Sequence, residues 1–113
     1  MNLGFKYQNK EEHEKAIEYF DKAAKINKNE PLVFSNRSFS KLKIGDLEGA
    51  KKDIEKSLKL MPSNSYAYKI RALIAIEQGK TKEACEDLFE SNKRGYTEHY
   101  GKEVNDLMRK HCN

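Results

Sequence analysis

The chain has 113 residues, 35% of them charged, and a formal net charge of +4. This length suits one compact unit, and its six tyrosines and five phenylalanines supply enough core material to exclude a disordered polar chain. Lysines alternate with acids, which is typical of solvated helix faces and disfavours nucleic-acid binding, and no apolar run approaches the ~18 residues that a membrane span needs.

Apolar residues three and four positions apart predict seven helices and no strand. The first four are expected over residues 2–8, 13–27, 31–44 and 47–61. The last three are expected over residues 66–78, 81–94 and 98–112. Pro31 suits a first helical position, Gly45 suits a helix end, and Ser63 is expected to cap the helix that follows it.

Two of these helices carry stripes that matter for the fold. In the second helix, the stripe from Ala16 and Phe20 to Ile26 is expected to face inward. In the last helix, an apolar stripe lies opposite a polar face, and its members are Tyr100, Val104, Leu107, Met108 and His111. That pattern predicts a terminal capping helix, with one face on the array and the other in water.

A period of 34 residues runs through the chain. It relates Ala16, Ala50 and Ala84 to one another. It also relates Phe20, Ile54 and Leu88. A fixed period of this length predicts stacked repeats, each too small to bury its own apolar face. We expect the three alanines to lie where paired helices cross closely, because a larger side chain would push the helices apart.

These residues resemble the tetratricopeptide repeat. The resemblance is carried by Leu3-Gly4, Tyr7, Ala16 and Phe20 in the first repeat, by Phe34, Ala50, Ile54 and Pro62 in the second, and by Tyr68, Ala72, Ala84 and Leu88 in the third. Arg37-Ser38, Lys41, Lys28 and Tyr96 depart from the family pattern. The resemblance implies an all-α fold, an alpha-alpha superhelix of helix-turn-helix repeats. It implies one domain over residues 1–113, with repeats at about 1–30, 31–64 and 65–96 and a capping helix at about 97–112.

The resemblance also implies a non-enzymatic protein–protein interaction module that binds a peptide or a partner helix on its concave face. The first helices would line that face, and their residues not needed for packing are Phe5, Ser35, Asn36, Phe39, Lys43, Tyr66, Lys69, Ile70, Leu73 and Glu77. Within this set Phe39 belongs to an apolar stripe, Asn36 is expected to face a peptide backbone, and Lys43 would favour an acidic ligand. Two alternatives stay open: a self-association module forming a homo-oligomer, and a regulatory domain of a longer chain.

Some family members bind acidic chaperone tails through a carboxylate clamp on three successive first helices. Asn36 matches one of its five places, by the resemblance. The other places hold Phe5, Tyr66, Ile70 and Met1, none of which is the required lysine, arginine or asparagine. Chaperone-tail binding is therefore not expected.

No catalytic, cofactor-binding or metal-binding set is expected from this sequence. Cys85, His111 and Cys112 lack the paired spacing of a metal site. Cys85 is expected to face the final helix, which returns antiparallel, so the two cysteines would approach each other. Free thiols are the default expectation, and a disulfide is the alternative in an oxidising compartment. The expected location is cytoplasmic, although a signal peptide removed beforehand would leave the same sequence.

Overall fold

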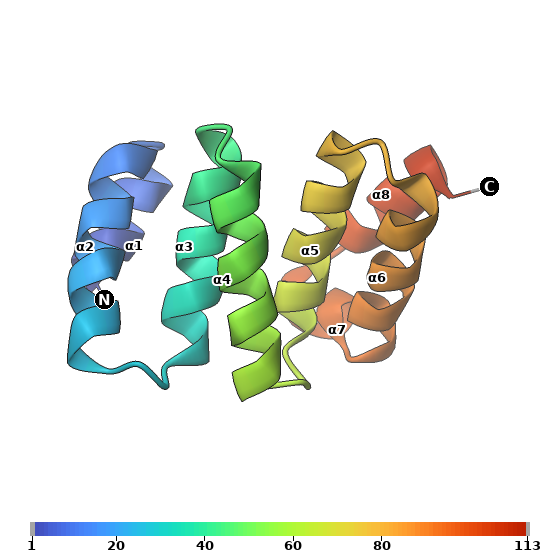
Figure 1. The fold of residues 1–113 in the computed structure, drawn as a ribbon. Coiled ribbons are helices and arrows are strands. Elements are labelled where there is room, and N and C mark those ends of the chain that lie inside the picture. The colour runs from blue at the N-terminus through green and yellow to red at the C-terminus, as the bar shows by residue number, and fades with distance from the viewer. Residues whose placement is uncertain (1, 113) are drawn as a thin grey trace. The chain divides into compact units, whose positions relative to one another are not determined.

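The computed structural model describes residues 2–112, apart from the side chains of Asn2 and His99. Within this range there are eight helices and no strand (Figure 1). The helices are α1 (Asn2–Asn9), α2 (His13–Ile26), α3 (Pro31–Lys43), α4 (Leu47–Leu60), α5 (Ser65–Glu77), α6 (Thr81–Lys93), α7 (Tyr96–Tyr100) and α8 (Glu103–His111). None of these helices is long and apolar enough to cross a bilayer. The expected all-α class is confirmed.

The chain divides into two compact units, Met1–Pro62 and Ser63–Asn113. The N-terminal unit holds α1 to α4, and the C-terminal unit holds α5 to α8. In each unit a short turn joins an antiparallel helix pair (Figure 1). The expected single domain and its repeat limits remain predictions.

The start of the N-terminal unit is held by Phe20, which has no exposed surface. It clusters with Ala16 and Val33, and Gly4 of α1 lies against its ring. A Cβ atom at Gly4 would stand 2.5 Å from the Phe20 ring, so only glycine fits there. The inward prediction is wrong for Ile26, which is 87% exposed because it is the last residue of α2 and lies beyond the packed stripe.

The α3–α4 hairpin shows why the sequence departs from the family pattern at two places. Arg37 donates from Nε and Nη2 to the two oxygens of Asp53, both at 2.8 Å, and from Nη1 to Asp21 at 2.9 Å. Lys41 Nζ lies 3.1 Å from the same Asp53 carboxylate. The two hydrogen bonds to Asp53 raise the pKa of Arg37 despite its partial burial, and the one hydrogen bond to Asp21 raises this pKa further. The two basic departures therefore bind one buried acid and join α3 to α4.

The same contacts recur 34 residues later in the C-terminal unit. Arg71 binds Asp87 of α6 at 2.9 and 3.0 Å. Ser91 donates to the Ser65 carbonyl at 2.6 Å, as Ser57 donates to the Pro31 carbonyl at 2.8 Å. The repeat seen in the sequence is thus a repeat of contacts.

Helix caps differ in one place from the sequence prediction. Asn64, not Ser63, precedes α5, and its side-chain oxygen accepts from the Ala67 backbone N–H at 3.4 Å. Asp46 caps α4 by accepting from the Gly49 backbone N–H at 2.9 Å.

The capping segment is two helices, so the prediction of one continuous helix over residues 98–112 is wrong. Gly101 has φ +103°, a left-handed conformation that ends α7 and turns the chain before α8. The break also divides the predicted stripe. Val104 is fully buried with Leu88 of α6, whereas Tyr100 is 58% exposed.

Candidate partner-binding surfaces

In the N-terminal unit, the exposed part of the predicted set is aromatic and basic. Phe5 of α1 is 39% exposed. Phe39 of α3 is half-buried, with the His13 ring at its edge, 6.0 Å between centroids. Lys43, one turn further along α3, places its ammonium 5.3 Å from the Phe39 centroid. An apolar ring held beside an exposed cation suits a ligand with an apolar and an acidic group.

The two polar members of the set in this unit are buried. Ser35 has no exposed surface and donates to the Leu32 carbonyl at 3.2 Å. Asn36 is 3% exposed. These side chains therefore present almost no surface to a peptide in this conformation.

Sequence reasoning missed a polar network that joins α1 to α3. Gln8 donates from Nε2 to the Asn36 carbonyl and to Ser40 Oγ, both at 2.8 Å. His13 Nδ1 lies 3.0 Å from Ser40 Oγ, so this histidine is part of the network and not a plain surface residue. Because Gln8 already donates to Ser40, the Ser40 hydroxyl proton is free to point to His13. Nothing in the spacing of these residues signals the network.

In the C-terminal unit, the capping segment covers part of the predicted set. Lys69 is 5% exposed, and its ammonium lies 2.9 Å from Glu103 Oε1 of α8. The same ammonium lies 5.6 Å from the Tyr66 centroid and 5.9 Å from that of Tyr96. Tyr96 donates its hydroxyl to Glu103 at 2.9 Å. We name these four residues the Lys69 cage.

The two tyrosines of the Lys69 cage have raised pKa values. Burial raises the pKa of Tyr66 far above its ordinary value of 10, and the nearby Glu103 charge raises it further. Burial also raises the pKa of Tyr96, with the hydrogen bond to Glu103 as the next cause. Both phenols therefore stay protonated in the folded protein well into the alkaline range.

The remaining members of the set lie further along α5. Ile70 is fully buried, Leu73 is half-buried and Glu77 is exposed. Sequence reasoning placed Tyr66, Lys69 and Ile70 on a face open to a partner. It could not show that the capping segment packs against Tyr66 and Lys69, or that Ile70 is fully buried. Met1, the remaining place of the clamp comparison, lies outside the described residues.

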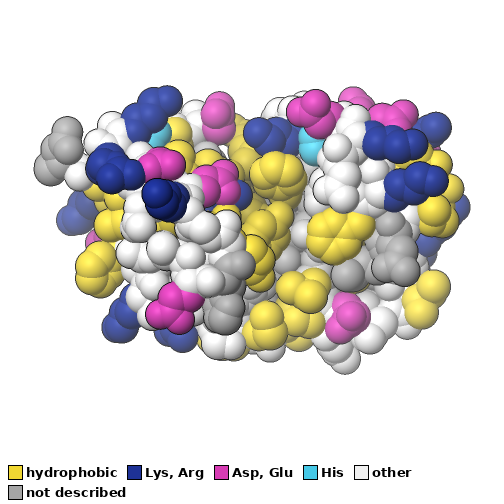
Figure 2. Space-filling model, turned by 180° about the vertical axis from the view of Figure 1, so that it is seen from behind, with side chains coloured by type: hydrophobic (Ala, Val, Ile, Leu, Met, Phe, Trp, Pro, Cys, Tyr) yellow, Lys and Arg dark blue, Asp and Glu magenta, His cyan; other side chains and the backbone are white. Residues whose placement is uncertain are grey.

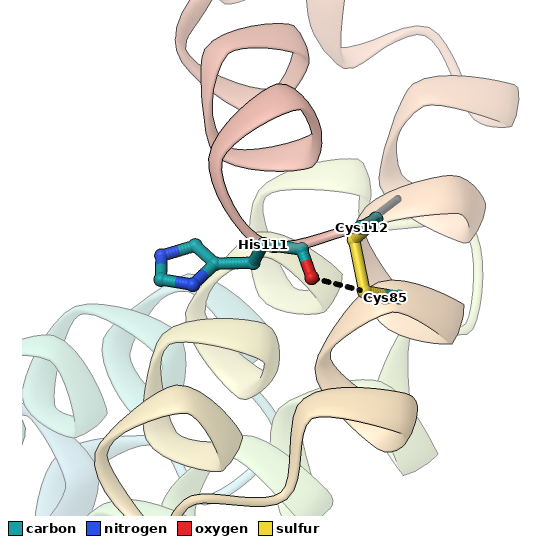
Figure 3. The surroundings of a disulfide bond; sticks show 3 residues. All are labelled: Cys85, His111 and Cys112. Atoms are coloured by element: carbon teal, nitrogen blue, oxygen red, sulfur yellow. Dashed lines mark hydrogen bonds between the residues drawn. A yellow bond between two sulfur atoms is a disulfide. The ribbon is translucent and has the colours of Figure 1, made fainter.

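Cys85 and Cys112 form a disulfide, with their Cα atoms 5.8 Å apart (Figure 3). The predicted proximity is confirmed, and the default expectation of free thiols is wrong, since the return of α8 brings the two sulfurs within bonding distance. Cys85 Sγ also lies 3.6 Å from the His111 carbonyl oxygen, and the His111 ring points away from the bond (Figure 3). Among the described residues, no group of three or more His, Cys, Asp or Glu side chains could hold a metal ion.

The surface charges are mixed. Figure 2 shows basic and acidic side chains interspersed over the face seen from behind, with hydrophobic side chains between them. A continuous basic stripe, as nucleic-acid binding would need, is not seen on that face.

Comparisons with known proteins agree with the repeat interpretation. A tetratricopeptide-repeat family profile matches residues 1–30. A TPR repeat-containing protein of Methanocaldococcus jannaschii is 33% identical over 93 residues, which are 82% of this chain and 16% of that protein. The chain thus spans less than a fifth of that relative.

Three solved tetratricopeptide domains have a similar fold. The first TPR of Spaghetti, solved with the HSP90 peptide SRMEEVD, has a TM-score of 0.83 at 20% identity, covering 95% of this chain and 82% of that one. The TPR domain of Arabidopsis OM64 has a TM-score of 0.85 at 22% identity, and the match covers 97% of this chain and 91% of that one. The TPR2B domain of yeast Sti1, in a complex with pHsp70, has a TM-score of 0.82 at 19% identity, and the match covers 96% of this chain and 86% of that one.

Proposed function

Because the chain belongs to the tetratricopeptide-repeat family, we propose that it is a non-enzymatic module that binds a peptide or a partner helix on the faces of its first helices. Two of the similar domains were solved with protein or peptide ligands. At 19–20% identity they share the fold, and the ligand class is our extension from it.

The observation that carries the proposal is the environment of Phe39. Its ring is partly exposed beside the Lys43 ammonium, and Phe5, one repeat earlier, is 39% exposed. Exposed aromatic side chains next to a cation are typical anchors for a protein ligand. We infer that the ligand presents an apolar side chain to Phe39 and a carboxylate to Lys43.

A chaperone tail is not the ligand that this surface favours. Asn36, the one match to the clamp, is 3% exposed, and Ile70, at another clamp place, is fully buried. Lys69 lies near the clamp positions, yet its ammonium is already paired with Glu103. We therefore assign the contact to Phe39 and Lys43 instead of Asn36.

The test is substitution of Phe39, with peptides selected on the wild-type protein from a displayed library of acid-rich sequences. Phe39→Ala should weaken binding of the selected peptides by about 1–3 kcal/mol, roughly 5- to 150-fold in Kd, as loss of an aromatic anchor does. Phe89→Ala is the matched control, because Phe89 is 62% exposed on α6, a second helix of its pair. Wild-type affinity in a stable, monomeric Phe39→Ala protein would refute the proposal.

The same variant separates the rival hypotheses. If the surface serves self-association, Phe39→Ala should shift an oligomer toward monomer in light scattering with no ligand added. If Phe39 is mainly a core residue, its substitution should lower the melting temperature much more than Phe89→Ala does. A role as the regulatory part of a longer chain would leave peptide binding intact.

A further inference from the structure

The capping segment packs two buried residues, Tyr96 of α7 and Val104 of α8, against Ala72 of α5 and Leu88 of α6. α7 has five residues and α8 has nine, and helices this short are unstable in isolation. Within α8 only Val104 is fully buried, while Leu107 and Met108 are partly buried. The segment therefore stays helical only while it is docked on α5 and α6, and its further contacts add to this small cluster.

Those contacts lie at the two ends of α8. At its start, Glu103 accepts from Lys69 and Tyr96 in the Lys69 cage. At its end, the disulfide joins Cys112 to Cys85 in the first half of α6. The covalent bond thus closes a segment with a sequence separation of 27 residues. Cross-linking a segment of this length removes much of the entropy that it would gain by opening.

We propose that the Cys85–Cys112 disulfide is a redox latch, which holds α7 and α8 over Tyr66 and Lys69 when closed and releases them when reduced. The reductant is a dithiol. It gives two electrons and two protons to the disulfide, so that the S–S bond becomes two thiols while the dithiol becomes a disulfide.

The local geometry suits a reversible bond. Both cysteines are partly exposed, so a dithiol can reach them. In the disulfide, Cys85 Sγ carries no proton and only contacts the His111 carbonyl oxygen at 3.6 Å. After reduction its thiol has that oxygen as an acceptor, which keeps it in place whenever the cap docks again. The latch would be open among cytosolic thiols and closed in an oxidising compartment.

Opening has a consequence for the surface of α5, and this step rests on the proposed function. With the cap closed, Lys69 is 5% exposed and paired with Glu103. Release of α7 and α8 removes Tyr96 and Glu103 from the cage and leaves Tyr66 and Lys69 open to solvent. Their aromatic and cationic groups then match those of Phe39 and Lys43, so the reduced protein gains binding surface for the same class of ligand.

The latch can be tested without any partner. Hydrogen exchange and brief acetylation with an amine-reactive ester are measured by mass spectrometry on the whole protein, with and without dithiothreitol. Reduction should speed amide exchange in α8 by on the order of 100-fold, the effect expected from freeing a loop of this size. Acetylation of Lys69 should rise at least ~10-fold, because local opening exposes its amine.

Two controls keep the test specific. Lys43 is exposed in the N-terminal unit, so its acetylation should be equal in both redox states. The double variant Cys85→Ser, Cys112→Ser should behave like reduced protein and not respond to dithiothreitol. Equal amide exchange of α8 in oxidised and reduced protein would refute the latch. Faster exchange of α8 on reduction without increased acetylation of Lys69 would refute the claim that opening exposes Lys69.

A final measurement distinguishes this inference from the proposed function. Peptides selected from the same library on the reduced protein should bind it about 3-fold or more tightly than they bind the oxidised protein, since Tyr66 and Lys69 become available. If Lys69 opens on reduction and Phe39→Ala still weakens the peptides, unchanged affinity on reduction refutes only the added binding surface. If neither change affects binding, the proposed function fails while the latch stands.

Discussion

Ala50 illustrates how little room the packing of α3 on α4 leaves for a side chain. It has no exposed surface, and its carbonyl accepts from the Ser38 hydroxyl at 2.6 Å. Ala16 and Ala84 are equally buried one repeat to either side. The expected burial of the three alanines is therefore confirmed.

Substitution of Ala50 should show that this restriction is steric. Ala50→Leu should lower the free energy of unfolding by about 1–3 kcal/mol through overpacking between α3 and α4. Lys52→Leu adds similar apolar volume to the exposed side of α4 and should cost far less. Urea unfolding followed by circular dichroism measures both. Equal, small losses would mean that the crossing can relax around a larger residue.

At the scale of elements, the contacts of α7 and α8 depend on neutral tyrosines. Tyr66 and Tyr96 both have a pKa raised far above 10, so the folded state holds their protons longer than the unfolded state does. The resulting stability is fully present below pH 10. It is lost as the pH rises from 10 toward the folded-state pKa values, because the unfolded chain releases these protons first.

We therefore expect alkaline loss of the capping segment. Above pH 10 the free energy that docks α7 and α8 should fall by up to about 1.4 kcal/mol per pH unit for each tyrosine. Tyr96→Phe should remove the contribution of one tyrosine from this pH dependence. The variant also loses the hydrogen bond to Glu103, so its stability is lower from the start. Tyr19→Phe in the N-terminal unit is the control. A slope unchanged by Tyr96→Phe, measured by α8 hydrogen exchange, would refute this account.

The capping segment also shows where sequence reasoning works and where it stops. The apolar stripe correctly predicts that Val104 faces the array, because period and burial follow from the same helix geometry. It does not predict the break at Gly101, since glycine is compatible with helix and turn alike and tertiary contacts decide between them. The return of α8 brings Cys85 and Cys112 together, but their oxidation depends on conditions that no sequence pattern encodes.

For the whole molecule, the 34-residue period predicts the helix pairs and the buried alanines. It predicts the candidate site less well. A period assigns Ser35, Asn36 and Ile70 to a face, but it does not say what packs on that face, and the structure buries all three. Partner binding by the residues that remain at least partly exposed, among them Phe39 and Lys43, stays a prediction. So do the cytoplasmic location and the absence of nucleic-acid partners.

The recurring Arg–Asp pairs carry a further consequence for folding. Arg37 binds Asp53 and Arg71 binds Asp87 with nearly the same distances, so each first helix is complementary to the second helix of either hairpin. The side chains therefore do not by themselves exclude domain swapping. Pairing within one chain is favoured instead by residues 44–46, which are long enough for α3 and α4 to close their hairpin at a high effective concentration.

Deleting residues 44–46 should stop α3 from folding back on its own α4, so that α3 of one molecule pairs with α4 or α6 of another. Pairing with α4 closes a dimer, whereas pairing with α6 shifts the partner by one repeat and leaves a free end for the next copy. Light scattering of the deletion variant at rising concentration should then show dimers together with larger species. A strictly monomeric deletion variant would show that something other than the turn sets the pairing.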